Sequence, residues 1–264
     1  MLNLPHMTSR PRAGFDVVPV LLVSAFVGVV VWGVTRPDKF GYDIEGESRR
    51  LSAVYGPDTN SEAVEEWAIR DFFGDRRGGF FLDVGAADYR AGSNTYFLET
   101  ALAWEGIAVE ALSSFGPDYE RHRPRTKFRS FFVSDRSNEL AKLFVLKQHT
   151  PVSSSDKTFT ERWGKDSVPV EIPTITLNDL LAAEGVTRID FLSMDIELSE
   201  PQALAGFDVG RFRPDLVCIE AHAETRQAIL DYFAIHGYVV VGKYLRADLL
   251  NLYFKPRGGS GRRL

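Results

Sequence analysis

The stretch FLDVGAADYRAGSNT, residues 80–94, begins as a buried β-strand and then breaks into glycine, alanine and polar residues. Residues 80–84 form a short apolar run of strand length. Gly85 lets the backbone turn tightly and approach a ligand closely, and Ser93 or Asn94 can cap the helix that follows. This strand–loop–helix unit is typical of α/β folds that bind a ligand beyond the end of a parallel strand.

Apolar runs of strand length alternate with helical segments along most of the chain. We expect a helix after the capping-box pattern at 59–62 and another capped by Thr176 with Asp179. Further strands are expected over residues 106–110, 127–133, 140–146, 168–172, 189–194 and 216–219, with a closing hairpin over 238–241 and 250–254. This alternation predicts a doubly wound, mostly parallel sheet with an antiparallel C-terminal hairpin.

Acidic residues lie at or just beyond the ends of five predicted strands: Asp83, Glu110, Asp135, Asp195 and Glu220. Because ligands bind beyond the carboxyl ends of parallel strands, we expect these acids to converge on one cleft. Glu110 suits the hydroxyls of a ribose, and Asp135 suits an adenine amino group. Asp83 either accepts from a ligand ammonium or orients the loop. Each acid taken alone is equally consistent with helix capping or solvent exposure.

The loop after the first strand distinguishes between two nucleoside-bearing cofactors. A pyrophosphate cofactor favours the pattern G-x-G-x-x-G at a helix N-terminus. Here the later glycine positions hold Ala87 and Asp88, and the carboxylate of Asp88 repels phosphate. The loop therefore favours S-adenosylmethionine, which carries a sulfonium and an amino-acid end, over a nicotinamide cofactor.

Two blocks of the sequence resemble the FkbM-type methyltransferases. The first is FLDVGAADYRAGSNTYFLE followed by WEGIAVEA, and the second is IDFLSMDIELSEPQALAGFD, after which DLVCIEAH and NLYFKPR also match the pattern. The resemblance covers about residues 60–256 and implies a class I, Rossmann-like methyltransferase fold that binds S-adenosylmethionine. It implies cofactor contacts from Asp83, Gly85, Ala86, Asn94, Glu110 and Asp135. The chain departs from the family pattern at Ala87, Tyr89 and Leu198.

The same resemblance implies a reaction pocket lined by Asp195 and Glu197, and O-methylation of a sugar or polyketide-type hydroxyl. We take Asp195, Glu197 and His222 as candidates for the base that removes the acceptor proton. These three residues also suit a divalent metal ion, but their spacing alone does not favour one, and we expect none. The polar stretch 148–166 is an acceptor-loop candidate.

Two other functions remain open at this stage. Tyr89 and Leu198 motivate a catalytically inactive, methyltransferase-like binding or trafficking module. The strand-end acids alone also fit a nicotinamide-dependent oxidoreductase.

Composition limits the choice of partners. The chain has 264 residues, a net charge of −5 and one cysteine, Cys218. A disulfide framework is excluded, and an acidic surface makes nucleic acid a poor partner. We interpret the short basic run 121–129 as solvated surface. The expected partner is a small-molecule or glycan acceptor, and nothing indicates an oligomeric state.

Residues 17–34 carry no charge over 18 positions, which is the lower limit for spanning a bilayer as a helix. We predict a tail at 1–16, a transmembrane anchor at 17–35, a linker at 36–58, the methyltransferase-like domain at 59–256 and a disordered tail at 257–264. A cleaved signal peptide is the alternative. The positive charges on the two sides of the predicted anchor are nearly equal in number. Arg49 and Arg50 add to the C-terminal side, which favours a membrane protein with its catalytic domain on the cytoplasmic side.

Overall fold

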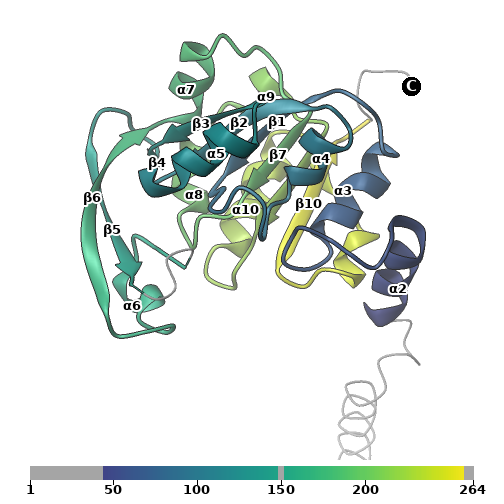
Figure 1. The fold of residues 1–264 in the computed structure, drawn as a ribbon, viewed down its shortest axis with the longest axis horizontal. Coiled ribbons are helices and arrows are strands. Elements are labelled where there is room, and N and C mark those ends of the chain that lie inside the picture. The colour runs from purple at the N-terminus through teal and green to yellow at the C-terminus, as the bar shows by residue number, and fades with distance from the viewer. Residues whose placement is uncertain (1–43, 148–151, 259–264) are drawn as a thin grey trace, which may run out of the picture. The chain divides into compact units, whose positions relative to one another are not determined.

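The computed structural model describes residues 44–147 and 152–258, and a seven-stranded sheet lies at its centre (Figure 1). The strand order is β3-β2-β1-β7-β8-β10-β9. Five strands are parallel: β1 (Phe80–Val84), β2 (Glu105–Glu110), β3 (Thr126–Ser130), β7 (Phe191–Met194) and β8 (Leu216–Glu220). β10 (Asn251–Pro256) runs antiparallel to both β8 and β9 (Tyr238–Val240). The predicted mostly parallel sheet and its antiparallel hairpin are confirmed.

Helices cover both faces of this sheet because neighbouring side chains of each strand point to opposite sides. On β1, Phe81 packs in one apolar cluster with α3 (Glu65–Phe73) and α4 (Tyr96–Thr100). Leu82 packs in the other cluster with four helices, namely α7 (Leu177–Ala183), α8 (Glu200–Ala205), α9 (Val209–Phe212) and α10 (Arg226–Ile235). Two short 3₁₀ turns, Ser113–Phe115 and Tyr244–Arg246, complete this part of the chain.

The strand predicted over 127–133 is instead two strands in two sheets. It breaks at Phe131, whose N–H donates to the carbonyl of Glu110. β4 (Phe132–Val133) then pairs parallel with β6 (Ser167–Ile175), and β6 pairs antiparallel with β5 (Leu140–Leu146). The prediction of one continuous strand is wrong because the long β5–β6 hairpin, visible beside the main sheet in Figure 1, captures residues 132–133.

The N-terminal part of the described chain differs from expectation. Helix α2 (Ile44–Tyr55) forms inside the segment expected to be a linker, because Leu51 is buried and Arg50 pairs with Asp71. The capping box at 59–62 does not form. Instead Ser61 Oγ accepts from the N–H of Glu66, and the Glu66 carboxylate accepts from the N–H of Asn60.

The cap expected further along is confirmed. Thr176 Oγ1 accepts from the N–H of Asp179 at 3.0 Å at the start of α7.

The predicted anchor at 17–35 lies outside the described residues, as do the tail at 1–16 and residues 259–264. Across residues 44–147 and 152–258, none of the helices combines the length and the apolar character needed to cross a membrane.

Candidate active site

The loop after β1 crosses the carboxyl edge of the sheet between the ends of β2 and β7. The N–H groups of Gly85 and Ala86 both donate to the carbonyl of Val109. Gly85 has a φ of +84°, and a Cβ added there would lie 1.7 Å from the carbonyl oxygen of Asp195. Only glycine fits this position. Because Gly85 has no side chain, the loop after β1 can lie directly against the backbone at the end of β7.

Glu110 ends β2 and is held by the backbone. Its Oε1 accepts from the N–H of Leu112 at 2.9 Å, and its Oε2 accepts from the N–H of Ala87 at 3.2 Å. Burial raises the pKa of Glu110, and these N–H groups act against the rise. Glu110 lines a cavity with Phe131 and Val133, which we call the Glu110 cavity. A fixed carboxylate beside apolar side chains suits a ribose and a base.

Asp83 and Asn94 lie behind the same loop. Asp83 is buried and accepts from Thr95 Oγ1 at 2.7 Å, which favours its orienting the loop over its binding a ligand ammonium. Asn94 Nδ2 donates to Ser193 Oγ at 3.0 Å. Asn94 Oδ1 is buried without a hydrogen-bond partner among the described residues, and the side chain lines a second cavity. This oxygen is free to accept from a ligand donor such as an ammonium group.

Arg123 supports this loop, although we expected the run 121–129 to be solvated. Its side chain is fully buried and pairs with Glu99. It also donates to the carbonyl of Tyr89 at 2.8 Å and to Thr95 Oγ1 at 3.1 Å, and Thr95 in turn bonds Asp83. The interpretation of the whole run as surface is therefore wrong at Arg123. Its pairing with a carboxylate 24 residues earlier gives no local signal in the sequence.

Asp135 does not join the other strand-end acids. It follows β4 in the second sheet, is exposed, and accepts from Gln202 Nε2 and Ser134 Oγ. Tyr89, which departs from the family pattern, lies against His122 with ring centroids 4.7 Å apart. In the described part of the chain, neither Asp135 nor Tyr89 lines the Glu110 cavity or the second cavity.

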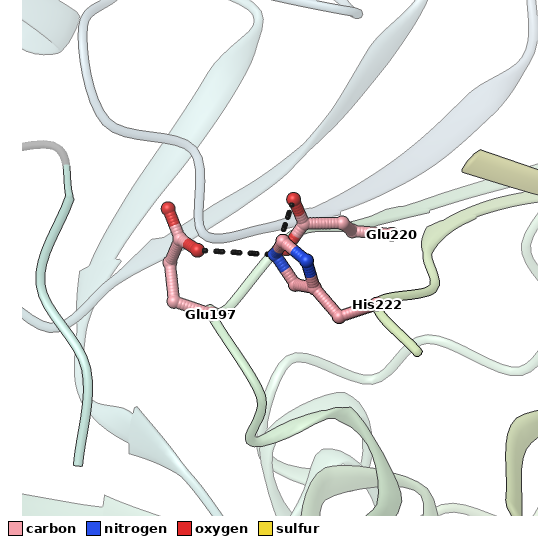
Figure 2. Close-up of side chains that lie close together, drawn as sticks. All are labelled: Glu197, Glu220 and His222. Atoms are coloured by element: carbon pink, nitrogen blue, oxygen red, sulfur yellow. Dashed lines mark ion pairs between the residues drawn. The ribbon is translucent and has the colours of Figure 1, made fainter. Parts of the chain in front are cut away.

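The remaining strand-end acids gather at the ends of β7 and β8 (Figure 2). His222 Nε2 lies 3.0 Å from Glu220 Oε1 and 3.6 Å from Glu197 Oε2. These three side chains line the second cavity together with Asn94 and Trp163, and we call it the Trp163 cavity. Sequence reasoning placed Glu220 at a strand end but did not assign it to the reaction pocket.

Gly85, Asp195 and Glu197 line both cavities, so the two cavities meet at these residues. Asp195 is exposed and opens into both cavities. Asp195 and Glu197 are therefore the two carboxylates at the junction of the site.

Burial dominates the electrostatics of this junction. It raises the pKa of Glu197 to about 8, with further contributions from Asp195 and Glu200. Desolvation by the surrounding protein also raises the pKa of Asp195 to about 6 and raises that of Glu220. Burial lowers the pKa of His222, and the nearby Glu224 carboxylate acts against this shift.

The polar stretch expected to be an acceptor loop contacts this junction through its described part. Ser154 Oγ donates to the carbonyl of Glu197 at 2.5 Å, shortly before α6 (Lys157–Thr160). The Phe159 ring packs edge-on against His222, with centroids 5.2 Å apart. Trp163 lines the cavity while remaining 59% exposed, which leaves its ring available at the rim.

A family model, the methyltransferase FkbM domain, matches residues 83–240, which include most of the first block, all of the second block and the five strand-end acids. The chain belongs to the FkbM methyltransferase family. The predicted resemblance is confirmed, and the cofactor is S-adenosylmethionine. The fixed carboxylate of Glu110 and the unpartnered Asn94 Oδ1 fit its ribose and its ammonium group. No curated protein matches the chain.

Solved structures of low similarity include other methyltransferases. A TehB-like S-adenosylmethionine-dependent methyltransferase from Corynebacterium glutamicum is 12% identical, with 83% of this chain and 100% of that chain covered and a TM-score of 0.43. An O-methyltransferase from Bacillus cereus is 13% identical, with coverages of 80% and 88% and a TM-score of 0.38. A precorrin-6y C5,15-methyltransferase from Geobacter metallireducens is 8% identical, with coverages of 66% and 70% and a TM-score of 0.39.

Proposed function

We propose that this methyltransferase methylates a hydroxyl oxygen of a small acceptor, such as a sugar, a glycolipid or a related metabolite. The observation that supports it is the position of Asp195, where the Glu110 cavity meets the Trp163 cavity. Glu110 would hold the ribose of the cofactor, and the same cavity reaches Asp195, where the methyl group would be supplied. An acceptor that enters through the Trp163 cavity reaches the same point.

The chain's own groups then have separate tasks. When bound, S-adenosylmethionine supplies a methyl group on a positively charged sulfur. Asp195 would take the proton of the acceptor hydroxyl while the acceptor oxygen received the methyl group, and S-adenosylhomocysteine would be the leaving product. A general base contributes about 10²–10⁴-fold, and alignment of the reactants contributes up to about 7–11 kcal/mol in ideal cases.

The rim of the Trp163 cavity supports a sugar-like acceptor. Trp163 offers a half-exposed ring on which the apolar face of a sugar can stack. Glu197 and His222, on the inner wall, can accept and donate hydrogen bonds to neighbouring hydroxyls. A purely apolar acceptor would leave these groups unpaired.

The test is transfer of a labelled methyl group from S-adenosylmethionine to pools of sugars and glycolipids. Asp195→Asn should lower turnover by about 10²-fold or more while cofactor binding persists. The control is Asp118→Asn, which changes an exposed carboxylate on α5 (Gly116–His122). Equal turnover of Asp195→Asn and Asp118→Asn would remove Asp195 as the base.

The backbone of the acceptor side also favours a second candidate, a binding module without catalysis. Glu197 and Leu198 have φ values of 52° and 76°, and Leu198 replaces the glycine usual in the family. If this strain misaligns the junction, the chain binds its cofactor but transfers no methyl group to any acceptor pool. Transfer of label by the intact chain would exclude this module.

We also propose that residues 17–35 anchor the protein in a membrane, with the methyltransferase domain on the cytoplasmic side. The uncharged run of 18 residues supports the anchor. The full chain should sediment with membranes and resist extraction by carbonate, and deletion of residues 1–35 should release it. A full chain that carbonate extracts would contradict the anchor.

A further inference from the structure

A compact set of side chains that could ligate a metal ion lies just beyond the carboxyl ends of β7 and β8. It consists of Glu197, Glu220 and His222. Each side chain offers one ligand atom, and the three atoms lie within 4.8 Å of one another. Figure 2 shows both carboxylates directed at the imidazole from different segments of the chain. The set combines two carboxylate oxygens with one imidazole nitrogen.

Unsatisfied atoms distinguish this set from an ordinary acidic surface. Glu220 is only 4% exposed, and its Oε2 has no hydrogen-bond partner. His222 Nε2 is likewise buried without a hydrogen-bond partner beside its ion-pair contacts. Within residues 44–147 and 152–258, the ion pairs join neither Glu197 nor Glu220 to a lysine or arginine. Buried carboxylates normally have such a partner or a metal ion.

We propose that Glu197, Glu220 and His222 bind a divalent metal ion on the wall of the Trp163 cavity. Metal–ligand bonds of about 2.0–2.2 Å at angles of about 90–110° place neighbouring ligand atoms about 2.8–3.6 Å apart. The two contacts of His222 Nε2, at 3.0 and 3.6 Å, agree with this spacing. A mixed oxygen and nitrogen set suits Mn²⁺ or Zn²⁺ better than Mg²⁺ or Ca²⁺.

The surrounding chain holds the three ligands in place. The Ser154 hydroxyl donates to the carbonyl of Glu197 and so fixes the Glu197 backbone. The Phe159 ring packs against His222. Glu220 is the last residue of β8, so the central sheet fixes its backbone. The ligands therefore come from three separately supported positions, and little reorganisation is needed on binding.

The position of this site defines what the metal ion does. It lies in the cavity assigned to the acceptor, beside Asp195. A cation there binds two adjacent acceptor oxygens and lowers the pKa of the hydroxyl that Asp195 deprotonates. This consequence rests on the proposed function, whereas metal binding itself does not.

The test is a titration of the full chain with Mn²⁺, without cofactor or acceptor. Electron paramagnetic resonance measures the concentration of free Mn²⁺ at each step, and the bound amount follows by difference. The intact chain should bind one Mn²⁺ per chain. Glu197→Gln and His222→Asn should each weaken binding by at least about tenfold. Glu224→Gln, which removes an exposed carboxylate two residues beyond His222, is the matched control and should bind as the intact chain does.

Thermal unfolding of each variant checks that it is folded. No Mn²⁺ binding by the intact chain up to millimolar concentration would overturn the site, as would equal binding by Glu197→Gln, His222→Asn and Glu224→Gln. Because binding is measured without methyl transfer, failure of the proposed reaction leaves this result unaffected. Loss of Mn²⁺ binding in Glu197→Gln together with retained methyl transfer would overturn only the role of the metal ion in the reaction, and not the metal site.

Discussion

The two ends of the site differ in how far the protein satisfies its own acids. At the cofactor end, Glu110 accepts two backbone N–H groups and Asp83 accepts from Thr95, which Arg123 holds in turn. At the acceptor end, Glu220 keeps an unpartnered oxygen, and the ionisable groups that act on it are Asp195, Glu197 and Glu200. The cofactor end is built as a rigid frame, whereas the acceptor end needs a proton, a cation or a substrate to complete it.

The frame is expected to fail most severely at Arg123. Arg123→Met should lower the free energy of unfolding by about 3–5 kcal/mol, because it leaves Glu99 as a buried, unpaired carboxylate. Urea unfolding measures this change. Arg121→Met, which removes an exposed ion pair on α5 two residues earlier, should have little effect. Equal stability of the two variants would show that the frame does not depend on the buried pair.

Gly85 tests the contact between the two ends. Gly85→Ala places a methyl group against the carbonyl of Asp195 at a φ of +84°, and should cost about 3 kcal/mol of stability. Denaturant unfolding and cofactor titration measure the loss. Gly242→Ala, where the added methyl meets open space, is the control. If Gly85→Ala matched that control, the two strand ends would not be as close as described.

A change at Leu198 tests the acceptor end, and here the substitution is expected to raise the stability of the fold instead of lowering it. Leu198→Gly relieves a left-handed residue and should raise the free energy of unfolding by up to about 1 kcal/mol. The same change should weaken Mn²⁺ binding, because Glu197 loses its fixed backbone. Arg213→Gly, also at a positive φ but directly after α9, should stabilise the fold without altering Mn²⁺ binding. Unchanged Mn²⁺ affinity in Leu198→Gly would show that the strained backbone at Leu198 does not hold Glu197 in place for metal binding.

The smallest expected effect concerns pH. Burial raises the pKa of Glu200 to about 7 from an ordinary value of 4.5, so the folded chain holds a proton that the unfolded chain releases. Stability should therefore fall as pH rises from about 4.5 to 7. Glu200→Gln should reduce this slope by up to one proton in urea unfolding across that range. An unchanged slope would mean that Glu200 ionises normally in the folded chain.

The sheet and the register of its strand ends could be predicted because local apolar runs and turn residues specify them. The sequence placed Glu110, Asp195 and Glu220 at strand ends, and the structure agrees. Asp135 could not be placed, because β4 leaves the main sheet to pair with residues 42 positions later in β6. Arg123 was missed for the same reason, since its partners lie 24 to 34 residues away. Long-range pairing, not local propensity, decided both cases.

Isothermal titration with S-adenosylmethionine tests the central claim, that the cofactor end binds independently of the acceptor end. The intact chain and Glu220→Gln should both release heat and bind with similar affinity, whereas Glu110→Ala should lose binding. Absence of heat with the intact chain, or equal binding by Glu110→Ala, would contradict the account.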